Sequence, residues 1–290
     1  MIKIIFKTLS IIFLFLILLV FYLSYFGIKT DKFNNKITKK ILEIDKRINL
    51  NLDNVNYLIN PYNFTVNVET INPKINFEDI QLEIKSMKAN ISLKALLSSK
   101  FLIDEIQITT KEIKINDVIL LVRSFKNSTE LFLLNEFIKN GFLTTDIKLN
   151  FDDTGRIKDD YQINGFIKKG ELKFLNQFNF KNLNFDFNIN KNQYSLTEIK
   201  TDFNDIKISS KLIQLHERKN HFLVKGNIET KEKNFETEQL KILFSNFLKN
   251  LDIKKIRFSS VNDFSFNITK KLRINDFNIE SEVFLKQLNI

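Results

Sequence analysis

The longest uncharged stretch of the chain, from Thr8 to Ile28, most constrains what the protein can fold into. A helix of about twenty residues covers roughly 30 Å, the thickness of a bilayer's hydrocarbon core. The residues around Gly27 offer no small-residue cleavage site of the A-x-A kind, which argues against a removable signal peptide. We therefore predict an uncleaved transmembrane anchor within residues 1–29. Its lipid-facing residues are expected to include Leu9, Ile12, Leu16, Leu19 and Phe21.

Charges on the two sides of this stretch bear on its orientation. Lys3 and Lys7 favour a cytoplasmic N-terminus, whereas five lysines between residues 29 and 40 oppose that preference. A short stub before a first apolar segment is typical of a signal anchor. We therefore expect the chain after the anchor to be exported.

Composition limits the remaining possibilities. Hydrophobic residues make up 43% of the 290 residues, which is enough for a substantial folded core. The net charge is +10, but the 44 Lys and Arg are interleaved with 34 Asp and Glu, and there is no Trp for base stacking. This distribution argues against nucleic acid as a partner. The absence of cysteine excludes disulfides and thiolate chemistry.

A basic connector follows the anchor at residues 30–48. Apolar residues recur in it every three to four positions, beginning at Phe33 and Ile37, so we predict an amphipathic helix. The helix either packs on a domain edge or lies at the membrane surface, where its lysines would meet acidic headgroups.

From residue 49 to 290 the hydrophobic period is mostly two, which indicates strands with one buried face. The alternating segments include Phe64–Val68, Ile80–Ile84, Ile147–Phe151, Phe185–Ile189, Phe264–Ile268 and Val283–Leu285. We expect on the order of fifteen strands in antiparallel meanders. The predicted fold is therefore mainly β: a transmembrane helix, then a long, curved, mostly antiparallel sheet that forms an open groove.

Four segments repeat a pattern of two apolar residues separated by two polar ones. A two-residue hairpin loop or a β-bulge would keep the apolar side chains on one face at each. The four segments are Phe77–Ile80, Phe203–Ile206, Val261–Phe264 and Ile274–Phe277.

Three helical interruptions are expected in the ladder of strands. They are a short turn at Ser92–Leu97, one broken or two short helices at Asp117–Asn140, and a helix at Glu236–Leu251 with a Leu and Phe face. About forty helical residues cannot cover some fifteen strands, so part of the apolar face needs another cover.

The single span, the basic connector and the segment Ile91–Ile108, which begins Ile-Ser-Leu-Lys-Ala-Leu-Leu-Ser-Ser-Lys, together resemble the AsmA-like family of Gram-negative envelope proteins. The resemblance implies a single-pass anchor in the bacterial inner membrane and a periplasmic β-groove. It also implies a role in moving phospholipid toward the outer membrane or in maintaining that membrane. Family members are usually much longer, and this chain stops inside an expected strand at Ile290, so we expect a fragment or a shortened member.

A crowd of large apolar side chains marks the expected groove. The alternation of side chains along a strand places the five between Phe178 and Ile189 on one face, provided that Lys181 and Asn182 form a bulge or loop. Phospholipid acyl chains could cover this face, and an ordinary sandwich core is the alternative. The predicted groove-lining residues are Phe178, Phe180, Phe185, Phe187, Ile189, Phe264 and Phe266.

Residues for chemistry are sparse. His216 and His221 lie in a polar run, and no Walker, G-x-S-x-G or G-x-G-x-x-G element occurs. We expect no enzyme activity, no cofactor and no metal site. Two classes of function stay open: a lipid-carrying groove, with other envelope proteins as further partners, and a structural envelope scaffold with a closed apolar core.

Overall fold

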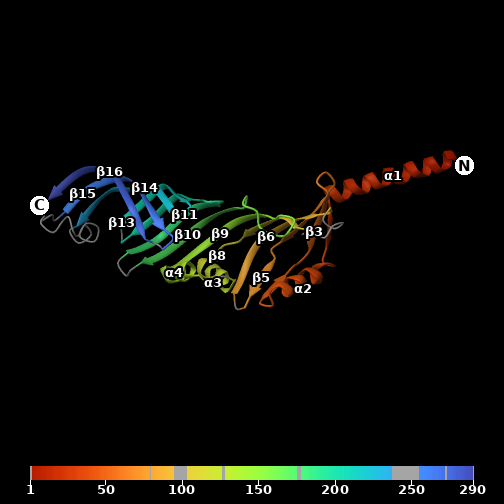
Figure 1. Cartoon of the computed structure of the whole chain (residues 1–290), viewed down its shortest axis with the longest axis horizontal. Coiled ribbons are helices and arrows are strands. Elements are labelled where there is room, and N and C mark those ends of the chain that lie inside the picture. The colour runs from red at the N-terminus through yellow and green to blue at the C-terminus, as the bar shows by residue number, and fades with distance from the viewer. Residues whose placement is uncertain are drawn as a thin grey trace. The chain divides into compact units, whose positions relative to one another are not determined.

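The structure, a computed structural model, is mainly β (Figure 1). It describes residues 2–78, 80–94, 103–125, 128–174, 178–204, 206–236, 255–271 and 273–289. The strands formed by these residues pair into one large, open, antiparallel sheet in the order β1-β3-β4-β6-β7-β9-β10-β11-β12-β13-β14-β15-β16. Strand β5 pairs with β2 and β6, and β8 pairs with β9. The predicted fold class is confirmed.

Contacts divide the chain into two units. Unit 1 comprises Met1–Ile113 and Thr145–Ile163, and unit 2 comprises Lys114–Thr144 and Asn164–Ile290. Strand β9 (Ile138–Asn150) contributes residues to both. The two units are described separately below.

The described part of unit 1 contains two helices and most of the short strands. Their bounds are α1 (Ile2–Tyr25), β1 (Ile28–Thr30), α2 (Asn34–Ile44), β2 (Ile48–Asn51), β3 (Val55–Asn60), β4 (Thr65–Ile71), β5 (Lys74–Phe77), β6 (Ile80–Ser92), β7 (Ile103–Thr110) and β8 (Ile113–Lys114).

Helix α1 is the one helix among the described residues that is long and apolar enough to cross a membrane. All five predicted anchor residues lie on it with exposed side chains: Leu9, Ile12, Leu16, Leu19 and Phe21. The helix begins before the predicted stretch, at Ile2, and ends before it, at Tyr25. It ends early because Gly27 takes a positive φ of 66° and the chain turns there into β1. Ile28 therefore belongs to a strand and not to the helix.

The connector forms α2, as predicted, and α2 packs on its own unit. The Asn34 side-chain amide donates to the Leu52 carbonyl at 2.9 Å, and the Thr38 hydroxyl donates to the Leu50 carbonyl at 3.0 Å. Leu50 itself is buried. These contacts support the interpretation of α2 as a helix at a domain edge.

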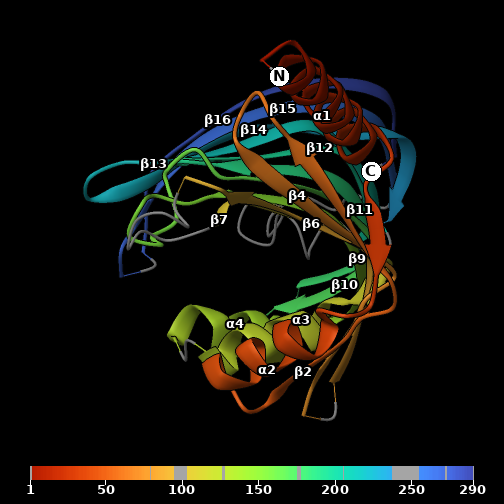
Figure 2. The same ribbon diagram turned by 90° about the vertical axis from the view of Figure 1, so that its right-hand side faces the viewer.

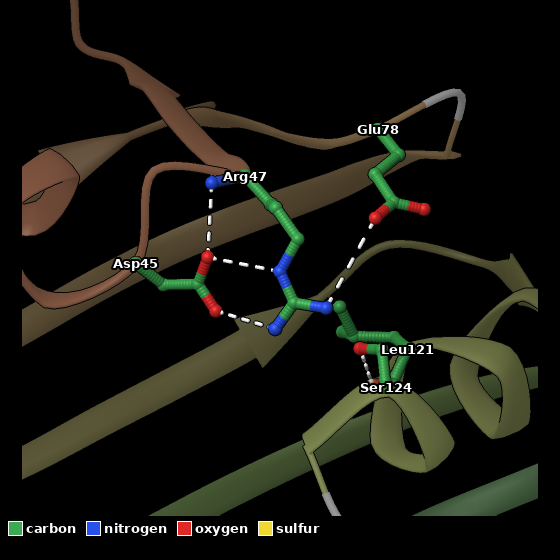
Figure 3. A network of polar contacts seen from close by, with 5 residues as sticks. All are labelled: Asp45, Arg47, Glu78, Leu121 and Ser124. Atoms are coloured by element: carbon green, nitrogen blue, oxygen red, sulfur yellow. Dashed lines mark hydrogen bonds and ion pairs between the residues drawn. The ribbon is translucent and has the colours of Figure 1, made fainter.

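The turn after α2 is held by Arg47 (Figure 3). Its Nε and Nη2 donate to the two carboxylate oxygens of Asp45 at 3.0 and 2.7 Å, and its guanidinium lies 4.9 Å from the centre of the Phe77 ring. The Arg47 hydrogen bonds lower the pKa of Asp45 to about 2. Nη1 of Arg47 also lies 4.0 Å from Oε1 of Glu78, so one side chain joins this turn to the β5–β6 hairpin.

Among the residues described, unit 2 contains two helices and the longest strands. Their bounds are α3 (Ile115–Phe125), α4 (Thr129–Phe137), β10 (Gln162–Phe174), β11 (Phe178–Asn190), β12 (Gln193–Phe203), β13 (Ile206–Glu217), β14 (His221–Glu236), β15 (Lys255–Thr269) and β16 (Ile274–Asn289).

Helices α3 and α4 confirm the prediction of one broken or two short helices at Asp117–Asn140, although Ile138–Asn140 already belong to β9. Ser128 begins α4 as its N-cap, since its hydroxyl accepts a hydrogen bond from the Leu131 amide. In α3 the Ser124 hydroxyl donates to the Leu121 carbonyl at 2.6 Å (Figure 3). Both helices lie on one side of the unit 2 strands (Figure 2).

The apolar-x-x-apolar segments have three different outcomes. Phe77 pairs with Ile80 and Phe203 pairs with Ile206, so these two segments are tight hairpins, as predicted. Asp276 has a φ of 54° at a shift in the β15–β16 register, so the Ile274 segment contains a bulge.

The prediction for Val261–Phe264 is wrong, because this segment runs straight through β15. It pairs in continuous register with β14 on one side and with β16 on the other. Val261 and Phe264 consequently lie on opposite faces.

Two other predicted elements fall partly outside the described residues. Glu236 ends β14 instead of starting a helix, and the rest of the predicted Glu236–Leu251 helix lies outside the described part of the chain. Ser92 ends β6, and the predicted turn is described only as far as Lys94.

Candidate functional site

Register between the strands of unit 2 gathers apolar side chains on one face. One row of directly paired residues joins Phe187, Leu196, Ile213, Gly226 and Phe264, on five successive strands from β11 to β15. Since paired residues of neighbouring strands project to the same side of a sheet, this row defines an apolar face.

A second row is displaced toward the other ends of these strands and has the same character. It joins Phe180, Phe203 and Ile206 across β11, β12 and β13. The neighbouring row of Lys181, Asp202 and Lys207 lies on the opposite face and alternates in charge. One face of unit 2 is thus apolar and the other is charged.

A bulge in β11 keeps the apolar side chains of that strand together. The pairing with β12 shifts between Lys181 and Asn184, and Asn182 has a φ of 51°. The Thr201 hydroxyl donates to the Lys181 carbonyl at 2.9 Å, and the Asn182 amide donates to the Asp202 carboxylate at 2.7 Å. The predicted bulge at Lys181 and Asn182 is confirmed.

Two cavities lie along the apolar face, and both are lined by residues of unit 2 alone. The first has a volume of about 520 Å³ and extends from Ile115 of α3 and Leu134 of α4 to strands β10 through β14. The second has a volume of about 300 Å³ and lies between β11 and β15. Phe180, Ile208 and Ile228 line both, so the two cavities adjoin. We call this pair of cavities the groove.

Aromatic rings continue the apolar surface from α4 onto the sheet. Phe137 of α4 lies with its ring centre 4.8 Å from that of Phe174, and Phe178 follows at 6.2 Å. The Phe203 ring lies 6.0 Å from Phe178 and 4.7 Å from Phe180. These spacings fall within the range of favourable aromatic pairs.

The predicted groove residues occupy this face in different ways. Phe180 and Phe185 line the cavities. Phe187 lies over Gly165 of β10, in direct contact with the position that a Cβ would take, and Phe264 lies over Gly226 of β14 in the same manner. Each ring occupies space that a side chain at the glycine would need.

The other three predicted residues lie on the same face beside the cavities. Phe178 stacks between Phe174 and Phe203, Ile189 pairs with Tyr194, and Phe266 stacks on Phe264 at 5.9 Å. The structure therefore brings all seven residues to one face but sets only two of them in the groove.

Sequence reasoning missed several groove residues. Their signal was the apolar residues along β11 to β14, whose side chains are smaller and less conspicuous than phenylalanine. These residues are Leu183, Leu196, Ile199, Ile208, Ile213 and Ile228.

Two hydroxyl groups at the groove wall form hydrogen bonds within the protein. The Thr201 hydroxyl donates to a backbone carbonyl, and the Ser210 hydroxyl donates to the Asn227 side chain at 3.2 Å. A ligand in the groove would therefore meet apolar surface with few free polar groups.

The charged face carries a larger hollow of about 650 Å³. Within it Lys211 lies 3.0 Å from Glu229, and Asp202 accepts the Asn182 hydrogen bond. Exposed pairs of this kind are typical of a solvated surface, so we do not place the site here.

Among the described residues, no group of three His, Cys, Asp or Glu side chains could hold a metal ion. Comparison of the chain with family models, with curated proteins and with solved structures found no match.

Proposed function

We propose that this chain is a membrane-anchored envelope protein whose groove in unit 2 holds the acyl chains of phospholipid. Helix α1 would anchor it in the bacterial inner membrane, and the remaining residues would lie in the periplasm. The groove would then take part in moving phospholipid toward the outer membrane or in maintaining that membrane, as in the AsmA-like family that the sequence resembles.

The observation that carries the proposal is the pair of adjoining apolar cavities on a sheet face whose phenylalanines remain only half-buried. Each buried methylene is worth about 0.8 kcal/mol, so an acyl chain that fills even part of the groove gains useful affinity. The first cavity alone, at about 520 Å³, falls in the size range of ligand sites.

Photocrosslinking in living cells tests the groove directly. A photoreactive residue at Phe180 should capture phospholipid, because Phe180 lines both cavities. The matched control is Lys181, the next residue, which lies on the charged face and should capture none. A photoreactive residue at Phe187 extends the test along the apolar face.

A closed envelope scaffold is the competing function. It is favoured by the contribution of α3 and α4 to one wall of the groove, through Ile115 and Leu134. If photoreactive residues at Phe180 and Phe187 crosslink only to protein, the lipid-groove function is wrong and the scaffold function replaces it.

The location is tested separately by reporters fused after Ile290. A reporter that is active only in the periplasm should give signal, and its cytoplasmic counterpart should stay silent. The reverse pattern would place the two units in the cytoplasm.

A further inference from the structure

The hairpin between β3 and β4 extends beside the C-terminal end of α1. Strand β1 pairs antiparallel with β3, with Ile28 opposite Tyr57 and Thr30 opposite Val55. Because the two strands are antiparallel, the residues of β3 that follow Tyr57 lie beside the residues that precede Ile28, which are the end of α1. Residues 58–64 have no partner in β1 and continue alongside the helix.

A pocket of about 370 Å³ lies between this hairpin and α1. Val20, Phe21 and Ser24 line it from the helix, and Leu58 and Tyr62 are among the residues that line it from the hairpin. All of these residues belong to unit 1. The pocket is therefore partly built from the segment that is apolar enough to cross a membrane.

The depth of the pocket follows from helix geometry. Val20 precedes the end of α1 at Tyr25 by five residues, which is about 8 Å of helix. Interfacial segments bury their apolar parts about 5–10 Å into the boundary between headgroups and acyl chains. With α1 across a bilayer, the tip of the hairpin lies at that boundary.

The tip exposes the kind of side chains that favour this boundary. Tyr62 is 94% exposed and Phe64 is 57% exposed, and Tyr25 and Phe26 at the end of α1 are exposed as well. Tyr and other aromatic residues are enriched at the membrane interface. The Lys94 ammonium lies 5.8 Å from the centre of the Phe64 ring, so a positive charge lies beside this apolar tip. Negatively charged lipid phosphates attract such a charge at the membrane surface.

Two backbone amides of the tip have hydrogen-bond partners within the protein, so they do not need water. The Asn60 side-chain oxygen accepts hydrogen bonds from the amides of Tyr62 and Asn63 at 3.1 and 3.2 Å. Ser24, on the opposite wall of the pocket, has a buried hydroxyl with no hydrogen-bond partner among the described residues. A lipid ester carbonyl is a suitable acceptor for it.

We propose that the β3–β4 hairpin is a second membrane contact, inserted into the interface beside α1, and that its pocket receives the glycerol end of one phospholipid acyl chain. The inference rests on the membrane anchor of the proposed function but not on the groove in unit 2.

The chain contains no tryptophan, so a single introduced Trp reports its own depth. Each variant is reconstituted as the full chain in vesicles of phosphatidylethanolamine and phosphatidylglycerol, with bromine either near the glycerol end or near the methyl end of the acyl chains. The hairpin probe is Tyr62→Trp. The matched control is Ile71→Trp, an exposed position at the far end of β4. The anchor control is Phe15→Trp, in the middle of α1.

Shallow bromine should quench Tyr62→Trp more strongly than deep bromine does, and neither should quench Ile71→Trp. Deep bromine should quench Phe15→Trp most. If Phe15→Trp is quenched but Tyr62→Trp is not, the hairpin proposal is overturned while the anchor stands. If Phe15→Trp is not quenched either, the hairpin and the anchor both fail.

Occupancy of the pocket is measured with a photoreactive residue at Ile59, which lines it. Capture of phospholipid at Ile59 but not at Ile71 supports the acyl-chain site. Equal capture at both positions, or none at Ile59, overturns it. The outcome is independent of crosslinking at Phe180.

Discussion

Units 1 and 2 carry the same alternation of apolar and polar residues but cover their apolar faces differently. In unit 1 the strands β2 and β5 and the helix α2 close over the face, and Leu50, Val55, Phe77, Leu82 and Ile84 are all buried. In unit 2 the phenylalanines of β11 remain half-buried beside the cavities. Alternation therefore reports which face is apolar and says nothing of what lies against it.

The difference has a local cause in unit 1. Strand β6 continues beyond its pairing with β4 and pairs with β5 through the Phe77–Ile80 hairpin, and β5 in turn pairs with β2. Arg47 then holds this hairpin against the turn after α2. In unit 2 the covering elements described are α3 and α4, and they reach the groove at one end.

The largest effect is expected for Phe77→Ala. Phe77 is 1% exposed, and truncation of a fully buried phenylalanine costs about 3–5 kcal/mol. Equilibrium unfolding of the full chain in detergent measures this cost, with Ile71→Trp as the reporter in unit 1 and Leu212→Trp as the reporter in unit 2. The loss should appear with the unit 1 reporter.

The matched change in unit 2 is Phe180→Ala. Phe180 is only partly buried at the groove, so we expect a smaller destabilisation, about 2 kcal/mol, together with a loss of phospholipid crosslinking from Phe187. If Phe180→Ala costs as much as Phe77→Ala, the groove face is closed in the folded protein and the contrast between the units disappears.

Sequence reasoning predicted the faces of the strands well where bulky residues alternate. The alternation at Ile80, Leu82 and Ile84 corresponds to β6, and the alternation at Phe185 and Phe187 corresponds to β11. Local patterns suffice here, because the side chains of a strand point alternately to its two faces.

Sequence reasoning could not predict contacts between distant residues. The buried pair of Ile206 and Phe235, with Ile208, Ile256 and Phe258 packed against it, joins segments about 30 to 50 residues apart in the chain. Val261–Phe264 was misread for a related reason: Asn262 and Asp263 favour turns locally, but pairing with strands on both sides holds them extended.

A smaller effect is expected for Gly27→Ala, which tests how α1 is joined to unit 1. Gly27 has a φ of 66°, and a Cβ there would lie 2.7 Å from the Tyr57 carbonyl oxygen. The left-handed conformation alone costs a non-glycine residue about 1–2 kcal/mol. We expect a loss of at least that size with the Ile71→Trp reporter, because the Tyr57 carbonyl must also move.

The control for Gly27→Ala is Gly155→Ala, which places the same side chain at a φ of 82° in the turn between β9 and β10. In both variants alanine must adopt a left-handed backbone conformation. Only at Gly27 does the new Cβ also clash with Tyr57, so this variant displaces β3 from the end of α1. It should therefore reduce quenching of Tyr62→Trp by shallow bromine, while the Gly155 variant should leave it unchanged. Equal behaviour of the two would show that the hairpin is positioned without Gly27.

The smallest effect concerns the pH dependence of unit 1. Hydrogen bonds from Arg47 hold the pKa of Asp45 at about 2, below its ordinary value of 3.8. A carboxyl group whose pKa is lower in the folded state stabilises the fold above its unfolded pKa, and this contribution is lost as the pH falls through the folded pKa. The destabilisation caused by Asp45→Asn should therefore be fully present at about pH 5 and fade toward about pH 2.

Unfolding with the Ile71→Trp reporter across this pH range measures the effect of Asp45→Asn. The control is Asp53→Asn, which removes the same charge from the same unit. Because Asp45 lies at the surface, the effect should also shrink in high salt. A difference between Asp45→Asn and the parent chain that stays constant down to pH 2 would show that the Arg47 bonds do not stabilise the ionised carboxylate. In that case the turn after α2 would be held by the Arg47 contacts with Phe77 and Glu78 alone.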